Sequence, residues 1–262
     1  MYDFTYVKPT SIPDAVKALG EIDSKALAGG QTFIPVLKQR LNKPSSIVDL
    51  SALDLRAISA TAFCITVGAM ATHHDIERHA DIKARIPSLA EMASWIGDIQ
   101  VRHRGTMGGS LANNDPSACY PAAALALDAT IHTNKRAIKA DDYFKGMFLT
   151  ALDTDELIIK VDFPVPEKSS YEKFRNPASR YAMVGVFVAK GPSGTRVTVT
   201  GAGQDGVFRH TAMEQALDTN WSADAIKNIV TPSDGLNGDI HASPEYRAHL
   251  IGVMARRAVA AA

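Results

Sequence analysis

The sequence predicts an α+β fold built in more than one part, and three stretches carry the prediction. A strand, a helix and a second strand follow one another before residue 55, which is the order of a small β-α-β unit. A linker with prolines at 164 and 166 then interrupts the chain before Tyr171. Strands come first and helices second behind this linker, an order typical of a separate α+β domain. We therefore expect one domain over residues 1–166, with subdomains over about 1–55 and 56–166, and another over 171–262.

The composition excludes several classes of protein. The chain has 262 residues, 46% of them hydrophobic, which is enough for a sizeable core. Its 28 basic and 28 acidic residues balance, with no basic stripe, so nucleic acid is not an expected partner. No run of about 18 apolar residues and no signal peptide occur, so we expect no membrane span and a cytoplasmic location. Cys64 and Cys119 are too few for a cysteine-rich metal site, so any electron carrier in this chain should be organic.

Local signals justify each element of the first part. Ser11 is a typical helix cap, with Pro13 and Asp14 in the first turn, and predicts a helix to about Leu19. Lys25–Ala28 reads as a short buried strand, and Ser46–Leu50 as a second one. Between them, Thr32 is expected to cap a helix whose apolar residues continue to Leu41.

The middle of the chain alternates strands and helices. Phe63–Gly68 predicts a strand, and Thr72–Asp75 resembles a capping box for a short helix through His79. Ser88 is expected to cap a helix that carries Ile96, and the polar stretch Gly97–Asp115 is expected to be a loop. The remaining predictions are a helix at Pro121–Leu127 and strands at Thr130–Thr133 and Leu157–Phe163.

The last part has a clear order of strands and then helices. The expected strands are Tyr171–Phe174, Met183–Ala189 and Arg196–Thr200, the last two joined by a hairpin-like turn at Gly191–Gly194. The expected helices are Thr211–Leu217, Ser222–Ile229 and a final one from Ser243 to the C-terminus.

Two glycine pairs are the strongest functional signal. They lie in Ala28-Gly29-Gly30-Gln31-Thr32 and in Thr106-Met107-Gly108-Gly109-Ser110. Glycine allows a backbone to approach an anion closely, and consecutive N–H groups in such turns hold phosphate oxygens. The first segment matches neither the P-loop nor the dinucleotide-fold pattern, so a turn without a ligand is the alternative. Together, the two segments could grip both phosphates of one dinucleotide.

Polar residues follow the second glycine pair closely. Thr106, Ser110, Asn113 and Asp115 supply hydrogen-bonding groups in the expected loop, and a long loop inside a domain is usually functional. The nearby Arg102 and Arg104 could neutralise phosphate, or could be surface charge only.

These segments resemble a known family, the FAD-binding medium subunits of the molybdenum hydroxylases. This family includes the carbon monoxide dehydrogenase medium subunit and the flavin domain of xanthine dehydrogenase. The resemblance rests on the two glycine motifs with Asp115-Pro116, and it continues through the rest of the chain. Further similar segments are Ile47–Leu50, Gly68–His73, Gln100–Gly105, Lys173–Arg175, Glu245–Leu250 and Arg256-Arg257.

The resemblance implies a fold, a cofactor and partners. The implied fold is the FAD-binding type of the vanillyl-alcohol oxidase relatives, two subdomains that clasp FAD, followed by a C-terminal α+β domain. The implied task is electron transfer in a heteromeric oxidoreductase. A large molybdopterin subunit oxidises substrate, a small [2Fe-2S] subunit carries electrons to the FAD of this subunit, and an external acceptor receives them. The implied assembly is a dimer of heterotrimers.

The resemblance also implies the FAD-binding residues, with no catalytic residue and no metal in this chain. The two glycine motifs would cradle the pyrophosphate, with Asn113 and Asp115 near the ribityl and ribose. Ile96 and Tyr181 would lie on the two faces of the isoalloxazine, and core packing is their alternative role. The expected residues are Leu27, Ala28, Gly29, Gly30, Gln31, Thr32, Ile96, Thr106, Met107, Gly108, Gly109, Ser110, Asn113, Asp115 and Tyr181.

Cys119 is the departure from the family pattern that matters most. The family usually has Asp there, and that carboxylate contacts the FAD ribose, whereas a thiol is a weak donor and acceptor. Losing a charge-assisted contact costs about 1.5–3 kcal/mol. We therefore expect FAD to bind but to be lost easily from the isolated protein.

Other hypotheses are a self-contained flavin-dependent oxidoreductase and a subunit that has lost tight FAD binding. The chain's short length and the absence of an evident catalytic cluster disfavour the first. A metal site at His73, His74, Glu77 and His79 is also disfavoured, because a full ligand set is not evident. The sequence names neither the substrate of the complex nor its acceptor, which could be quinone, NAD or oxygen.

Overall fold

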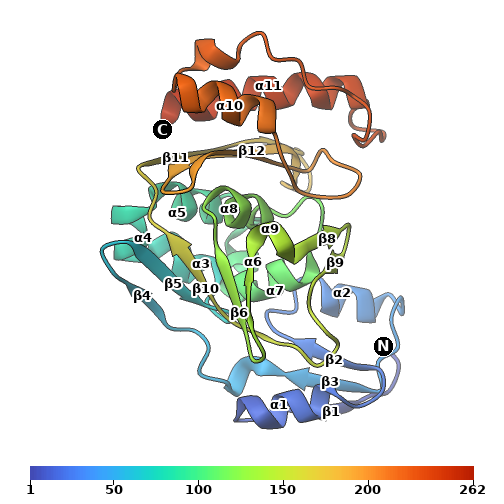
Figure 1. The fold of residues 1–262 in the computed structure, drawn as a ribbon. Helices are drawn as coiled ribbons and strands as arrows, with labels where there is room; N and C mark the ends of the chain where they lie inside the picture. The colour runs from blue at the N-terminus through green and yellow to red at the C-terminus, as the bar shows by residue number, and fades with distance from the viewer.

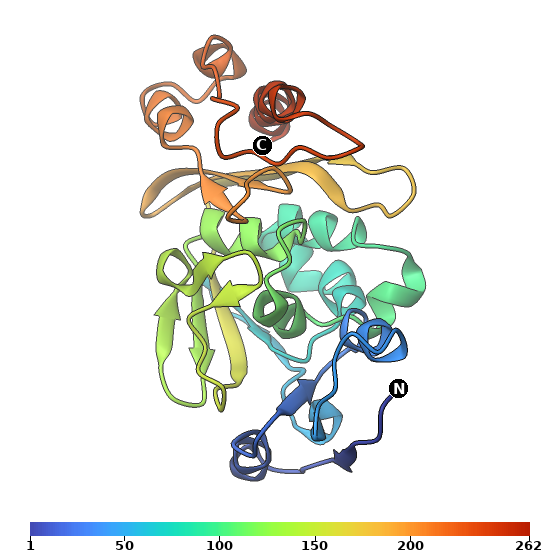
Figure 2. The same cartoon turned by 90° about the vertical axis from the view of Figure 1, so that its right-hand side faces the viewer.

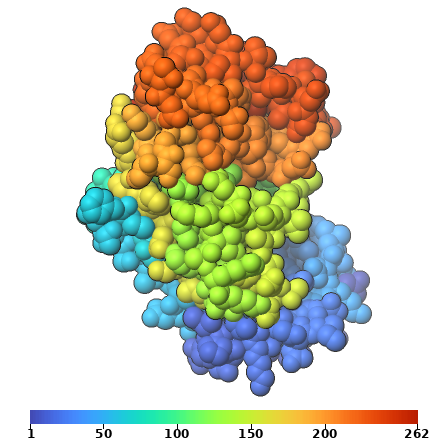
Figure 3. Space-filling view, viewed as in Figure 1, coloured from blue at the N-terminus to red at the C-terminus, as the bar shows by residue number.

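The computed structural model describes all 262 residues, Met1–Ala262. Three parts are stacked along the molecule: a small N-terminal lobe, a middle layer of helices around a sheet, and a C-terminal sheet covered by helices (Figure 1). The space-filling view shows the three parts in direct contact (Figure 3). None of the helices combines the length and the apolar character that crossing a lipid bilayer requires.

The N-terminal lobe is a three-stranded parallel sheet in the order β1-β3-β2. Its elements are β1 (Thr5–Val7), α1 (Ile12–Leu19), β2 (Ser24–Leu27), α2 (Phe33–Lys38) and β3 (Ser46–Asp49). The predicted β-α-β unit is therefore confirmed, and the added strand is β1. Ser11 caps α1 as predicted, because its hydroxyl accepts the N–H of Asp14 at 3.3 Å.

Two details of this lobe were predicted wrongly. The Thr32 side chain makes no capping hydrogen bond to α2, because its own backbone is already helical, with φ −98° and ψ −49°. The helix ends at Lys38, and Leu41 is 72% exposed beyond it. The hydroxyl of Thr32 is thus left free for another partner.

The middle layer contains a five-stranded antiparallel sheet in the order β4-β5-β10-β6-β7. Its strands are β4 (Ile58–Ala60), β5 (Cys64–Gly68), β6 (Thr130–Thr133), β7 (Ala137–Lys139) and β10 (Ile158–Pro164). Its helices are α3 (His73–Arg78), α4 (Ala80–Arg85), α5 (Pro87–Ser94), α6 (Ile99–Arg104), α7 (Met107–Asn113), α8 (Tyr120–Ala126) and α9 (Ala140–Tyr143). A small hairpin of β8 (Phe144–Gly146) and β9 (Leu149–Thr150) completes the layer. The predicted capping box of α3 is confirmed.

The predicted loop at 97–115 is wrong, since it contains the two short helices α6 and α7. Each begins at a capping side chain: Asp98 accepts the N–H of Val101, and Thr106 accepts the N–H of Gly109. Ser88 is also not a cap. It lies inside α5, and its buried hydroxyl shares a 2.6 Å hydrogen bond with the hydroxyl of Ser169 in the C-terminal sheet.

The C-terminal part is a four-stranded antiparallel sheet with helices on one face. Its strands are β11 (Lys168–Arg175), β12 (Ala182–Gly191), β13 (Gly194–Thr200) and β14 (Phe208–Arg209). The helix α10 (Thr211–Thr219), the 3-10 turn η2 (Ala223–Ile226) and α11 (Pro244–Ala261) lie on the face that points away from the middle layer (Figure 2). The expected linker is shorter than predicted because β11 already begins at Lys168, and the predicted helix at 222–229 is only η2.

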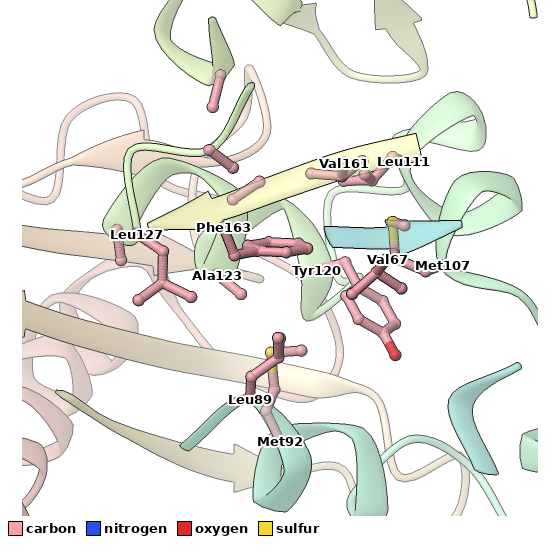
Figure 4. Packing of buried hydrophobic residues seen from close by; sticks show 14 of the residues in the cluster. Val67, Leu89, Met92, Met107, Leu111, Tyr120, Ala123, Leu127, Val161 and Phe163 are labelled. Atoms are coloured by element: carbon pink, nitrogen blue, oxygen red, sulfur yellow. The ribbon is translucent and has the colours of Figure 1, made fainter. Parts of the chain in front are cut away.

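Both faces of this sheet are buried, each in a different core. Tyr171 and Phe187 point into the large core of the middle layer, whereas Val184 and Val186 pack beneath the C-terminal helices. In the large core, Leu89 and Met92 of α5 face Phe163 of β10 (Figure 4). Residues on both sides of position 166 therefore share one apolar core.

A buried arginine adds a polar link between the same two layers. Arg196 of β13 is 7% exposed, and its guanidinium donates to Asp128 at 2.8 Å and to Asp141 at 2.9 Å. It also donates to the carbonyl of Leu125 in α8 at 3.0 Å. Removing one partner of a buried pair leaves the other charge unpaired.

We expect Arg196→Met to lower the free energy of unfolding by about 2 kcal/mol, because the Leu125 carbonyl loses a buried donor, and Asp128 and Asp141 keep only their longer contacts to Lys139 and Arg209. Urea denaturation followed by circular dichroism measures this change. Lys135→Met is the control, because the exposed Lys135 pairs only with surface carboxylates and its loss should change the midpoint little. Equal effects of the two substitutions would contradict the structural role given to Arg196.

Candidate functional site

A cavity of about 770 Å³ lies where the three parts meet. Its walls come from the β2–α2 loop, the start of α3, the segment from α5 to α8, and the β11–β12 region. This volume is in the range of about 300–1,000 Å³ typical of ligand sites. No other part of the fold brings so many distant segments together around one space.

The two glycine segments touch each other at one side of this cavity. A Cβ atom at Gly29 would lie 2.1 Å from the carbonyl oxygen of Arg104, and one at Gly109 would lie 3.5 Å from the Cβ of Ala28. Only a residue without a side chain permits the first contact. The two segments therefore lie side by side, and the closest contact joins Gly29 to Arg104 and Gly105, just before the second segment.

The first glycine segment presents a row of free donors. The backbone N–H groups of Gly29, Gly30, Gln31 and Thr32 make no hydrogen bond within the protein. Gly30 has a left-handed backbone with φ +71°, which turns successive N–H groups toward a common point. Unpaired N–H groups are normal at the start of a helix, and where they line a cavity they suit an acceptor-rich anion such as a phosphate.

The second glycine segment has a different role. Its N–H groups already donate within the protein: Met107 to Ala71, Gly108 to Ala69, and both Gly109 and Ser110 to Thr106. Its glycines instead permit close packing, since a Cβ at Gly108 would lie 2.7 Å from Ala69. The free polar group that it presents to the cavity is the hydroxyl of Ser110.

Most of the residues predicted from sequence line this cavity. They are Ala28, Gly29, Gly30, Gln31, Thr32, Ile96, Thr106, Gly108, Gly109, Ser110, Asn113, Asp115 and Tyr181. The two exceptions are Leu27 and Met107. Leu27 packs beside Gly30, and Met107 is fully buried in the large core.

A buried lysine faces the cavity from the C-terminal sheet. Lys173 is 8% exposed, and its ammonium donates to the carbonyl of Trp95 at 2.8 Å and to the Cys119 sulfur at 3.5 Å. No carboxylate lies within 4.0 Å of this ammonium. A buried cation without a counter-charge is costly, so the site favours a ligand that carries negative charge or strong acceptors.

Aromatic and polar groups surround the same end of the cavity. Tyr181 is half exposed, and burial together with the nearby Asp115 raises the pKa of its hydroxyl. The Asp115 carboxylate accepts the N–H of Ser117 at 2.8 Å, which holds it at the start of the turn before α8.

The histidines that suggested a metal site do not converge. His73 lines the cavity, whereas His74 stacks on His103 with ring centroids 3.9 Å apart, and His79 lies 4.0 Å from Asp81. No group of three or more His, Cys, Asp or Glu side chains has a geometry that could hold a metal ion.

Sequence reasoning did not identify Lys173, Phe148 or Arg180 as lining residues. A signal for Lys173 was present, because it lies two residues after the buried Tyr171 and so shares its face of β11. Phe148 gave no such signal. It lies at the tip of the β8–β9 hairpin with a left-handed backbone, φ +57°, and its N–H donates to the carbonyl of Asn114 at 3.1 Å.

Comparison with known proteins agrees with this geometry. A family described as "FAD binding domain in molybdopterin dehydrogenase" matches residues 2–166. The chain is 30% identical to the carbon monoxide dehydrogenase medium chain of Hydrogenophaga pseudoflava, covering 99% of this chain and 96% of that one. It is 32% identical to the glyceraldehyde dehydrogenase medium chain of Sulfolobus acidocaldarius, with 98% and 97% covered.

Solved structures show the same similarity over the whole chain. The carbon monoxide dehydrogenase from Hydrogenophaga pseudoflava superposes with a TM-score of 0.87 at 30% identity, covering 100% of this chain and 97% of that one. Quinoline 2-oxidoreductase from Pseudomonas putida 86 superposes with a TM-score of 0.88 at 27% identity and the same coverage. The predicted α+β fold is thereby confirmed.

We expect Gly29→Ala to force the two glycine segments apart, because the new methyl group would overlap the Arg104 carbonyl. The free energy of unfolding should fall by about 2 kcal/mol, measured by urea denaturation, and limited proteolysis should cut faster between the lobes. Gly20→Ala is the matched control, since its backbone is right-handed and its nearest contact would be 3.4 Å. Wild-type stability and proteolysis in Gly29→Ala would show that the contact is not tight.

Proposed function

The chain belongs to the family of FAD-binding domains of molybdopterin dehydrogenases, and we propose that it carries electrons between partner subunits and an external acceptor. Its cofactor is FAD, and it is an oxidoreductase subunit of the medium-chain type. In the proposed complex, a large molybdopterin subunit oxidises the substrate and a small subunit with [2Fe-2S] clusters passes electrons to this chain. The proposed assembly is a dimer of such heterotrimers.

The cavity residues suit FAD along its whole length. We propose that the free N–H groups of residues 29–32 and the Ser110 hydroxyl hold the diphosphate, with the remaining residues of the second glycine segment packed against it. Asn113 and Asp115 would contact the ribityl and ribose hydroxyls, and Ile96 and Tyr181 would cover the two faces of the ring. When bound, FAD supplies the reversible redox chemistry that amino-acid side chains lack.

The observation that carries this proposal is the row of four unpaired N–H groups beside a contact that tolerates no Cβ atom. A diphosphate offers several charged oxygens to such donors, and charge-assisted hydrogen bonds are about twice as strong as neutral ones. The unpaired Lys173 ammonium adds a second positive feature in the same cavity. Both features match an anionic dinucleotide better than a neutral substrate.

We further propose that the FAD-binding domain comprises residues 1–166, with subdomains over about 1–55 and 56–166, and that 171–262 is a C-terminal domain. The small lobe has its own core of Ala15, Leu19, Val48, Leu50, Leu53, Leu55 and Leu157. The C-terminal sheet contributes Lys173 and Tyr181 to the cavity, so its role is to close the site rather than to form a separate one.

Co-expression with the neighbouring reading frames tests the proposed function. The complex should purify with an iron–sulfur subunit and a molybdopterin subunit, and its visible spectrum should show flavin and [2Fe-2S] absorbance. Addition of the complex's substrate should bleach the flavin band. Substrate oxidation by this chain alone would instead support the self-contained flavin oxidoreductase.

Loose binding of FAD is the second candidate, and Cys119 is the observation that favours it. The thiol is buried in the cavity wall beside Lys173, where the family pattern has a carboxylate. A thiol accepts hydrogen bonds weakly, so both the ammonium and a ribose hydroxyl would lack a strong acceptor.

We expect Cys119→Asp to tighten FAD binding by about 10- to 100-fold, because one carboxylate can accept from both groups. Titration of the apo-protein with FAD, followed by flavin fluorescence, measures the dissociation constant. Cys119→Ser is the matched control, since it changes the sulfur without adding a charge and should have a small effect. Equal affinity in the wild type and Cys119→Asp would mean that position 119 does not contact the cofactor.

A further inference from the structure

Two buried side chains beside the cavity leave hydrogen-bonding atoms unpaired. His73 is 5% exposed and Tyr120 is fully buried, yet the His73 Nδ1 and the Tyr120 hydroxyl have no hydrogen-bond partner. Their rings are neighbours, with centroids 5.3 Å apart and planes inclined at 34°. An unsatisfied buried polar group costs about 1–3 kcal/mol, so a pair of them at a cavity wall indicates a functional role.

His73 reaches the cavity directly beside the second glycine segment. Its backbone N–H donates to the carbonyl of Gly105 at 3.0 Å, which fixes the start of α3 against that segment. A Cβ at Gly105 would lie 2.5 Å from the His73 Nε2, so the missing side chain leaves room for the imidazole. The ring lines the cavity, and no side-chain hydrogen bond engages Nε2.

The imidazole is neutral at physiological pH. Burial and, to a smaller extent, the positive charge of Arg102 together lower the pKa of His73 to about 4. The Arg102 guanidinium itself is paired with Glu77 at 2.9 Å, so it holds its position beside the ring. A neutral imidazole has one N–H donor and one acceptor nitrogen, and the neighbour of one nitrogen decides which tautomer forms.

We propose that His73 is a further positioning residue for the cofactor, whose Nε2–H donates a hydrogen bond to an oxygen of the bound FAD. A phosphate or carbonyl oxygen only accepts hydrogen bonds, so the bound ligand selects the Nε2-protonated tautomer, while Nδ1 has no partner in the protein. The inference rests on the proposed function, since FAD is the ligand.

The position of His73 points to the diphosphate as the acceptor. Gly29, which begins the row of free N–H groups, packs against Arg104 and Gly105, and the His73 Nε2 also lies against Gly105. A ligand oxygen that accepts from these N–H groups therefore lies near Gly105 and the imidazole. A neutral side-chain donor is useful here, because the N–H groups of the second glycine segment already form hydrogen bonds within the protein.

Amide replacements separate the two ring nitrogens. In His73→Gln the side-chain amide lies near the position of Nε2, so FAD affinity should stay within about 3-fold of the wild type. In His73→Asn the amide reaches only the position of Nδ1, so affinity should fall by about 5- to 10-fold. His74→Asn is the matched control with unchanged affinity, because the adjacent His74 does not line the cavity. FAD titration gives each dissociation constant, and urea denaturation shows that each variant folds.

Nitrogen-15 NMR of the wild-type protein tests the tautomer without any substitution. In the FAD-bound protein the His73 resonances should show Nε2 protonated, and FAD should shift the Nε2 signal more than the Nδ1 signal.

The outcomes are distinguishable. A wild-type protein that takes up no FAD overturns the proposed function. A wild type that binds FAD together with an unchanged His73→Asn, or with Nδ1 protonated, overturns the role of His73 only.

Discussion

The contact between Gly29 and the backbone of Arg104 and Gly105 is the constraint on which the rest of the site depends. It joins the small N-terminal lobe to the middle layer at a distance that no Cβ atom allows. The cavity lies beside this contact, and Gly29 and Gly105 both line it. The same contact places the free N–H groups of the first glycine segment beside His73 and the second segment.

The two glycine segments differ in how their backbone N–H groups are used and in how firmly they are held. The first belongs to a lobe with a core of only seven buried residues, and it keeps its donors unpaired. The second is anchored in a core of 32 buried residues, and its Met107 and Gly108 N–H groups donate to the carbonyls of Ala71 and Ala69, just after β5. A ligand that bridges them therefore adds contacts where the protein has fewest. Because such a ligand binds only the folded form, its binding also stabilises the attachment of the small lobe.

The sequence predicted the features that interactions between neighbouring residues determine. The caps of α1 and α3, the alternation along β13, and the glycine motifs all depend on neighbours in sequence. Failures occurred where a short helix is held by tertiary contacts: α6 and α7 contain polar residues and glycines, and their propensity alone does not predict helix. The sequence alone does not place Lys173 and Phe148 at the cavity, because strand β11 and the β8–β9 hairpin reach it only after the layers pack.

The balance of charge in the cavity explains why position 119 matters so much. The Lys173 ammonium has three donors, and the protein offers it one carbonyl and one sulfur. A thiol leaves the positive charge uncompensated until a ligand arrives, which favours an anion but gives a ligand hydroxyl no strong acceptor. A carboxylate would accept from the ammonium and from that hydroxyl at the same time, so it would bind the ligand without leaving a buried charge unpaired. The free backbone donors of the first glycine segment do not change this balance, because they supply no acceptor.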